Sequence, residues 1–268
     1  MKLLKYLVIV LFFAASTAWA GDVEDAVAAF DKKDYVTALN KYKSAALEGS
    51  AFAQNNLGAM YGNGQGVVQD SAEAVRWYKL ATVQGNASAQ YNLGAMYNFG
   101  QGVLQNYAEA LRWYKLAAVQ GNAIAQNNLG IMYNNGQGVL QDYAESVRWY
   151  KLAAVQGNAG GQYNLGVMYD NGQGVVQDYA ESVRWYKLAA VQGSASAQSN
   201  LGVMYNFGQG VLQDYARAHM WFNLAAVSGN ADALKNRNFV ASKMTPQQTV
   251  EAQKMARVCQ AQNFKNCD

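Results

Sequence analysis

The chain has 268 residues, of which 21 are Lys or Arg, 18 are Asp or Glu and one is His, so its formal net charge at pH 7 is +3. The basic residues are dispersed and form no dense tract, which argues against nucleic acid and against an anionic membrane surface as partners. A single histidine and two cysteines leave few side chains for histidine-dependent catalysis or a metal centre.

The first twenty residues have the pattern of a signal peptide. Lys2 and Lys5 precede an apolar run over residues 7–15, and a small-x-small motif ends at Ala20. The run is shorter than the roughly 20 residues of a membrane span, and no later segment is apolar enough to cross. We expect cleavage between Ala20 and Gly21, giving a protein that is periplasmic or secreted; a retained amphipathic anchor is the alternative. The mature chain then carries 19 basic and 18 acidic residues (21 less Lys2 and Lys5, against 18).

Residues 21–50 predict an N-terminal helical cap. Helices are expected over residues 23–30 and 35–47, the second being a degenerate relative of the repeating helices that follow. Terminal caps with polar outer faces keep an open-ended repeat array soluble.

A tryptophan then recurs every thirty-six residues, at Trp77, Trp113, Trp149, Trp185 and Trp221. Alignment on this residue gives five units: 51–86, 87–122, 123–158, 159–194 and 195–230. A fixed period of this length indicates a solenoid, whose units stack because none can bury its apolar face alone.

The second unit shows the expected pattern of each repeat: helix, glycine-rich turn, helix, short turn. Apolar residues at helical spacing predict a first helix over residues 87–97. Gly94 lies inside that helix, where it costs about 1 kcal/mol relative to alanine. Its return in every unit therefore predicts a close approach between helices. Asn106 suits the N-cap of the second helix, and Gly121 its end.

Residues 231–268 predict a C-terminal helical cap. A polar helix is expected over 231–243, and Thr245-Pro246 has the pattern of an N-cap followed by a first-turn proline. In an exported protein the close pair Cys259 and Cys267 predicts a local disulfide. A zinc or redox role is the alternative for the pair.

The motifs Ala-x-Ala-Gln-x-Asn-Leu-Gly-x-Met-Tyr, Gly-x-Gly-Val and Trp-Tyr-Lys-Leu-Ala-Ala-Val-Gln-Gly resemble the Sel1-like repeat family, relatives of the tetratricopeptide repeats. The resemblance covers residues 51–230 and implies an all-α fold, a right-handed α-solenoid of helix pairs used for protein–protein contact. Family repeats often carry proline after the Gly-x-Gly-Val turn, where this chain has Val68, Leu104, Leu140, Val176 and Leu212.

The second and third units differ at only seven positions, and four of these lie on or just after the first helix at spacings of three, four and four. Such spacing places them on one face. If the units stack as tetratricopeptide repeats do, this face lines a concave groove. The predicted partner-binding residues are Asn55, Tyr91, Asn127, Tyr163, Ser199, Asn98, Phe99, Asn134, Asp170, Asn206 and Phe207.

Other repeated residues have simpler interpretations. The tyrosines and phenylalanines of the face could instead fill gaps between turns. An asparagine present in every unit, as in Asn92, fits a joint between neighbouring units better than a peptide clamp. Glu–Arg pairs at i,i+3 on the second helices are typical of a solvated face. His219 replaces an apolar residue and is expected to pack against the C-terminal cap.

The sequence therefore predicts a non-enzymatic scaffold of the bacterial cell envelope that binds a partner protein or peptide. No catalytic residue is expected, because His219 is the only histidine and no Ser or Cys lies at a recognisable nucleophile elbow beside it. No cofactor or metal is expected, because the glycine turns lack both the lysine of a phosphate loop and the acidic ligands of a calcium loop. A peptidoglycan or other glycan binder is the first alternative. A β-lactam-interacting hydrolase is the second, since a cysteine-rich branch of similar repeats is associated with β-lactam binding, but this chain lacks the disulfide that such repeats carry in each unit.

Overall fold

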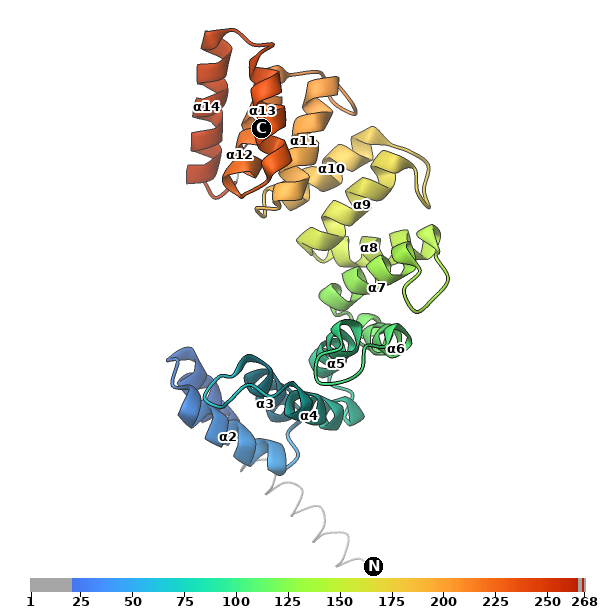
Figure 1. Cartoon of the computed structure of the whole chain (residues 1–268), viewed down its shortest axis with the longest axis vertical. Helices are drawn as coiled ribbons and strands as arrows, with labels where there is room; N and C mark the ends of the chain where they lie inside the picture. The colour runs from blue at the N-terminus through green and yellow to red at the C-terminus, as the bar shows by residue number, and fades with distance from the viewer. Residues whose placement is uncertain (1–20, 265–266, 268) are drawn as a thin grey trace, which may run out of the picture. The chain divides into compact units, whose positions relative to one another are not determined.

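The computed structural model describes residues 21–264 and 267, and this part of the chain is helical without any strand. The predicted signal peptide, with Ala20, lies outside the described residues. After a helix over residues 21–31, the chain forms α2 (Tyr35–Leu47), α3 (Ala51–Asn63), α4 (Ser71–Val83), α5 (Ala87–Phe99), α6 (Tyr107–Val119), α7 (Ala123–Asn135), α8 (Tyr143–Val155), α9 (Ala159–Asn171), α10 (Tyr179–Ala190), α11 (Ala195–Phe207), α12 (Tyr215–Val227), α13 (Ala231–Ala241) and α14 (Pro246–Ala261) (Figure 1).

Each repeat is one helix pair, beginning with α3–α4 and ending with α11–α12, which confirms the predicted fold class. In the second repeat the Asn86 side chain accepts a hydrogen bond from the Ala89 amide and so starts α5. The helix runs two residues beyond the predicted end and stops at Gly100, which has a left-handed φ of 66°. Asn106 then caps α6 by accepting from the Glu109 amide at 3.1 Å.

The glycine inside each first helix allows the two helices of a repeat to touch. A Cβ built on Gly94 would lie 2.7 Å from a ring carbon of Tyr114, and one on Gly130 would lie 2.6 Å from the ring of Tyr150. Both tyrosines are almost completely buried. A larger residue would have to displace a close-packed aromatic ring, so the predicted close approach is present.

A second glycine connects consecutive repeats. Gly102 has a φ of 68°, and a Cβ there would collide with the backbone carbonyl of Ser71 in the preceding repeat. Gly174 has the same relation to Tyr143. The glycine-rich turn of one repeat thus packs against the backbone of the preceding repeat, at the first residue of that repeat's second helix.

A buried glutamine also joins the repeats. Gln162 donates from Nε2 to the Ala154 carbonyl of the preceding repeat at 3.2 Å, and its Oε1 accepts from Gln192 Nε2 at 2.7 Å. Gln54 and Gln84 form the same pair in the first repeat, at 2.9 Å. Each pair connects the start of the first helix with the end of the second. In Gln162 both the amide NH2 group and the carbonyl oxygen of the buried side chain thereby have a hydrogen-bond partner.

The chain divides into two compact units, each with its own apolar core. The first runs to Ala125 and includes Gln137–Val139; the second comprises Gln126–Gly136 and the chain from Leu140 onward. In the first, Leu57 and Met60 belong to one buried cluster and Leu93 belongs to another. In the second, the largest fully buried side chain is that of Trp221, which belongs to a cluster formed by residues of α10 to α14 and Cys267.

The C-terminal cap packs on the last repeat, with α13 and α14 both against α12 (Figure 1). Thr245 caps α14 and Pro246 is its first residue, as the Thr-Pro motif predicts; the Gln248 side chain completes a capping box. Cys259 and Cys267 are buried and disulfide-bonded, with their Cα atoms 4.9 Å apart. No helix in the described part of the chain is long and apolar enough to cross a bilayer.

Candidate partner-binding surface

In the first compact unit the predicted partner-binding residues on the first helices are partly exposed, and their side chains contact neighbouring side chains. Asn55 on α3 accepts a hydrogen bond from Nδ2 of Asn92 on α5 at 3.0 Å. The centre of the Tyr91 ring lies 5.8 Å from the centre of the buried Tyr114 ring. Both variable residues are half-buried. They are accessible to a partner, yet their side chains are fixed by these contacts.

The second unit repeats this arrangement. Asn127 accepts from Nδ2 of Asn164 at 2.9 Å, and the Tyr163 ring lies 5.9 Å from that of Tyr186. Ser199, next along the row, is also half-buried. Asn92 and Asn164 therefore join consecutive repeats, as the structural interpretation of the repeated asparagine predicts. Asn56 differs, because its Nδ2 donates to the Phe52 carbonyl of its own helix at 3.0 Å.

The residues at the last turn of the first helices differ in exposure. Asn98, Asn134 and Asp170 are half-buried. The hydroxyl of Tyr186 donates to Asp170 Oδ2 at 3.2 Å, and burial raises the pKa of that carboxyl above its ordinary value.

Asn206 does not fit the predicted surface, because only 5% of it is exposed. It lines a small cavity of about 90 Å³ together with Phe239 and Val240 of α13, so the C-terminal cap covers this end of α11. The repeat pattern could not reveal this burial, since α13 lies outside the repeats.

Two aromatic residues at helix ends are largely exposed. Phe99 is 66% exposed and Phe207 is 64% exposed, whereas asparagine occupies the equivalent positions 63, 135 and 171. Phe207 also borders the small cavity beside α13. Exposed aromatics of this kind are frequent anchors in protein interfaces.

A further row of exposed apolar residues was not recognised from the sequence as a possible contact surface. One aliphatic side chain per repeat, at the turn after the Gly-x-Gly-Val motif, is 86–91% exposed: Val68, Leu104, Leu140, Val176 and Leu212. The signal was present in the sequence, because an apolar residue recurs at a turn where the fold needs no apolar contact.

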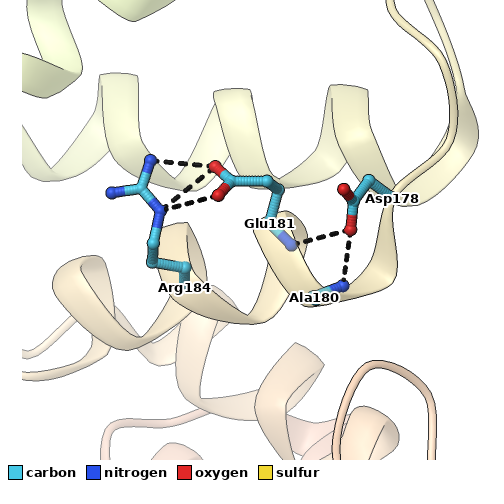
Figure 2. Close-up of polar contacts among 4 residues, drawn as sticks. All are labelled: Asp178, Ala180, Glu181 and Arg184. Carbon is cyan, nitrogen blue, oxygen red and sulfur yellow. Dashed lines mark hydrogen bonds and ion pairs between the residues drawn. The ribbon is translucent and has the colours of Figure 1, made fainter.

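The charged residues of the second helices have a structural role. Figure 2 shows Asp178 accepting from the amides of Ala180 and Glu181 at the start of α10, and Arg184 paired with the Glu181 carboxylate at 2.8 Å. The guanidinium of Arg184 lies 4.1 Å from the centre of the Trp185 ring. These groups cap the helix and cover the tryptophan ring. The Glu181–Arg184 pair lies on a solvated face, as its i,i+3 spacing predicts.

The described residues include no group of three His, Cys, Asp or Glu side chains placed to hold a metal ion. His219 is 2% exposed within α12. Burial and the positive charge of Arg237 on α13 lower the pKa of this histidine, so it packs as a neutral side chain beside the C-terminal cap.

The model of the Sel1 repeat family matches residues 51–86, 87–122, 123–158, 159–194 and 195–230, the five predicted units. The crystal structure of a Sel1 repeat protein from Oxalobacter formigenes is similar at 31% sequence identity with a TM-score of 0.78, covering 88% of this chain and 96% of that one. A Pseudomonas aeruginosa protein, 5086, shares the fold at 21% identity and a TM-score of 0.50, over 75% of this chain and 81% of its own. No curated protein matches significantly in sequence. Five matched repeats over most of its length place this chain in the Sel1 repeat family, whose members are generally protein–protein interaction scaffolds.

Proposed function

We propose that the protein is a non-enzymatic scaffold of the bacterial cell envelope, which binds a partner protein or peptide on the variable face of its first helices. The observation that carries the proposal is the exposure of Phe99 and Phe207, 66% and 64%, at positions where other repeats have asparagine. The asparagines show that the fold does not require an aromatic residue there. The two phenylalanines therefore offer exposed aromatic surface that a partner can cover.

The energy available from these residues is large enough to matter. A phenylalanine buries about 200 Å² of surface. Covering the exposed two-thirds at about 25 cal/mol per Å² contributes about 3 kcal/mol for each residue. One such anchor changes a dissociation constant by roughly a hundredfold.

The fixed orientation of the half-buried residues supports the same face. Tyr91 packs on Tyr114 and Asn55 is bonded to Asn92, so neither side chain loses much freedom when a partner binds. Pre-ordered contacts of this kind reduce the entropic cost of association. The envelope location is supported by the signal-peptide pattern of residues 1–20 and by the disulfide between Cys259 and Cys267.

The test is site-specific photo-crosslinking in living cells, with the crosslinking amino acid at position 99 or 207. We expect one discrete protein adduct from each position and none from position 115, an exposed lysine of α6. Tyr91→Asn should weaken the adduct at position 99, because asparagine is the residue of the next repeat and preserves the fold. Asn106→Asp, another exchange between these two repeats, is the matched control and should leave the adduct unchanged. Equal labelling from positions 99 and 115, or none at all, would refute the proposed face, and fractionation of the cells tests the location.

A further inference from the structure

The first compact unit contains a polar cavity of about 310 Å³ between its first two repeats. Side chains from α3, α4 and α5 and from the two turns form its walls. Four carboxamides line it, those of Asn63, Gln69, Asn92 and Gln101. Three hydroxyl groups join them, from Ser71, Tyr78 and Tyr91.

Three small residues accompany this cavity. Gly62, Ser71 and Ala95 line it, and each is smaller than its counterpart two repeats later, which are Asn134, Tyr143 and Val167. A Cβ built on Gly62 would lie 4.0 Å from the Tyr78 hydroxyl, so a longer side chain at this position would enter the cavity.

The other lining residues are the same at the junction of the first and second repeats and at the junction of the third and fourth. The counterparts of the other seven lining residues are Asn135, Gln141, Tyr150, Tyr163, Asn164, Met168 and Gln173, identical in type. The chain therefore carries the same polar set twice, but small residues accompany it only at the junction of the first and second repeats. This difference is not needed for folding, since the same scaffold accepts Asn, Tyr and Val at the equivalent positions.

The lining contains no charged side chain. Burial raises the pKa of Tyr78 to about 12, so its phenol stays protonated at neutral pH. Gln69 Nε2 donates to the Gly62 carbonyl at 2.7 Å and Asn92 Nδ2 to Asn55 at 3.0 Å, which fixes both carboxamides. An ionic ligand would lose hydration here without a countercharge, and an apolar ligand would leave amides and hydroxyls unpaired. The cavity suits a neutral ligand rich in donors and acceptors.

We propose that this cavity binds one ring of a neutral saccharide. A sugar ring presents hydroxyl groups around its edge, each able to donate and accept, and carboxamides and hydroxyls supply both functions. The volume is near the lower limit for small-ligand sites, about 300 Å³. A peptide is a poorer fit, because an extended chain advances about 3.3 Å per residue and the cavity would take in only about two residues.

The experiment titrates the mature full-length protein with sugars and follows amide chemical shifts of the cavity residues. The neutral probes are methyl β-glucoside, methyl β-galactoside and N-acetylglucosamine. The comparison probes are glucose 6-phosphate, N-acetylneuraminic acid and an end-blocked alanine tripeptide. We expect at least one neutral sugar to bind saturably with a Kd of about 1 mM or lower. Absence of binding by every neutral sugar, or preferential binding of the tripeptide or of a charged sugar, would overturn the proposal.

Variants taken from the chain's own repeats locate the site. Gly62→Asn, Ser71→Tyr and Ala95→Val together fill the cavity with the residues of the later junction and should weaken binding at least tenfold. Ser71→Tyr alone is the second variant, should the triple change disturb folding. Asn134→Gly, Tyr143→Ser and Val167→Ala should open a second site and raise the stoichiometry from one to two. Unchanged affinity in the folded filling variants would show that the sugar binds elsewhere and would overturn the assignment.

Discussion

Replacement of Ser228 by glutamine should stabilise the C-terminal repeat. In the first four repeats the sequence Val-Gln-Gly lies at the end of the second helix, and the glutamine donates to the buried glutamine of its own repeat, as Gln192 does to Gln162. The fifth repeat has Ser228 instead. Gln198, which is 0% exposed, still donates to the Ala190 carbonyl at 3.2 Å, but no donor from the described residues reaches its buried Oε1.

The magnitude follows from three contributions. Pairing a buried acceptor that lacks a donor is worth about 1–3 kcal/mol. Ordering a glutamine side chain costs up to about 1.5–2 kcal/mol, less where part of the chain stays mobile. The Ser228 hydroxyl bond to the Leu224 carbonyl at 3.3 Å is replaced rather than lost, since Gln192 makes the same bond to Leu188 at 3.2 Å. The net gain is about 1 kcal/mol, which corresponds to a rise in Tm of about 2–4 °C.

The assay is urea unfolding together with native-state hydrogen exchange, because stability in a repeat array is set by each repeat and its neighbours. We expect the gain in the amides of α11 and α12. Ser228→Asn is the matched control and should give no gain, because its amide is one methylene too short. Gln192→Ser is the reverse change and should cost about 1–2 kcal/mol by leaving Gln162 Oε1 without its donor. If neither Ser228→Gln nor Gln192→Ser alters stability, the glutamine pair does not stabilise the joint between repeats.

Three further predictions concern other features of the fold. Gly130→Ala should destabilise the protein by about 1–3 kcal/mol in thermal unfolding, because the added Cβ would lie 2.6 Å from a buried tyrosine ring. Gly62→Ala is the control: its added Cβ would lie 3.7 Å from the nearest atom, so the change should stabilise the helix by up to about 1 kcal/mol. The pKa of His219 is lowered in the folded state, so protons favour the unfolded chain: stability should fall as the pH drops below about 6.5, and His219→Val should remove this dependence in urea titrations at several pH values. Cys259→Ser with Cys267→Ser should reduce protection against hydrogen exchange in α14 by at most about 2–3 kcal/mol and leave the first four repeats unchanged; a global loss would contradict a local role.

Much of this protein can be predicted from its sequence because its repeats are nearly identical. The spacing of Trp77 and its four counterparts defines the units, and the family match covers the same residues. Local patterns also predict the helix starts, since N-caps such as Asn106 act through backbone amides only two or three residues away. Gly94 predicted a close helix contact because its conformational cost requires a compensating reason.

The tertiary structure decided which of the repeated positions are exposed to a binding partner. Asn206 follows the same pattern as Asn98 and Asn134, but α13 covers it. The buried glutamine pairs join residues thirty positions apart. That Gln198 Oε1 lacks a donor among the described residues is therefore recognised only when position 228 is placed beside it in space. Local sequence determines where helices and turns begin and end, because the capping and helical hydrogen bonds join residues only a few positions apart. Exposure, joints and cavities depend on side chains from neighbouring repeats and caps, and only the folded arrangement brings these together.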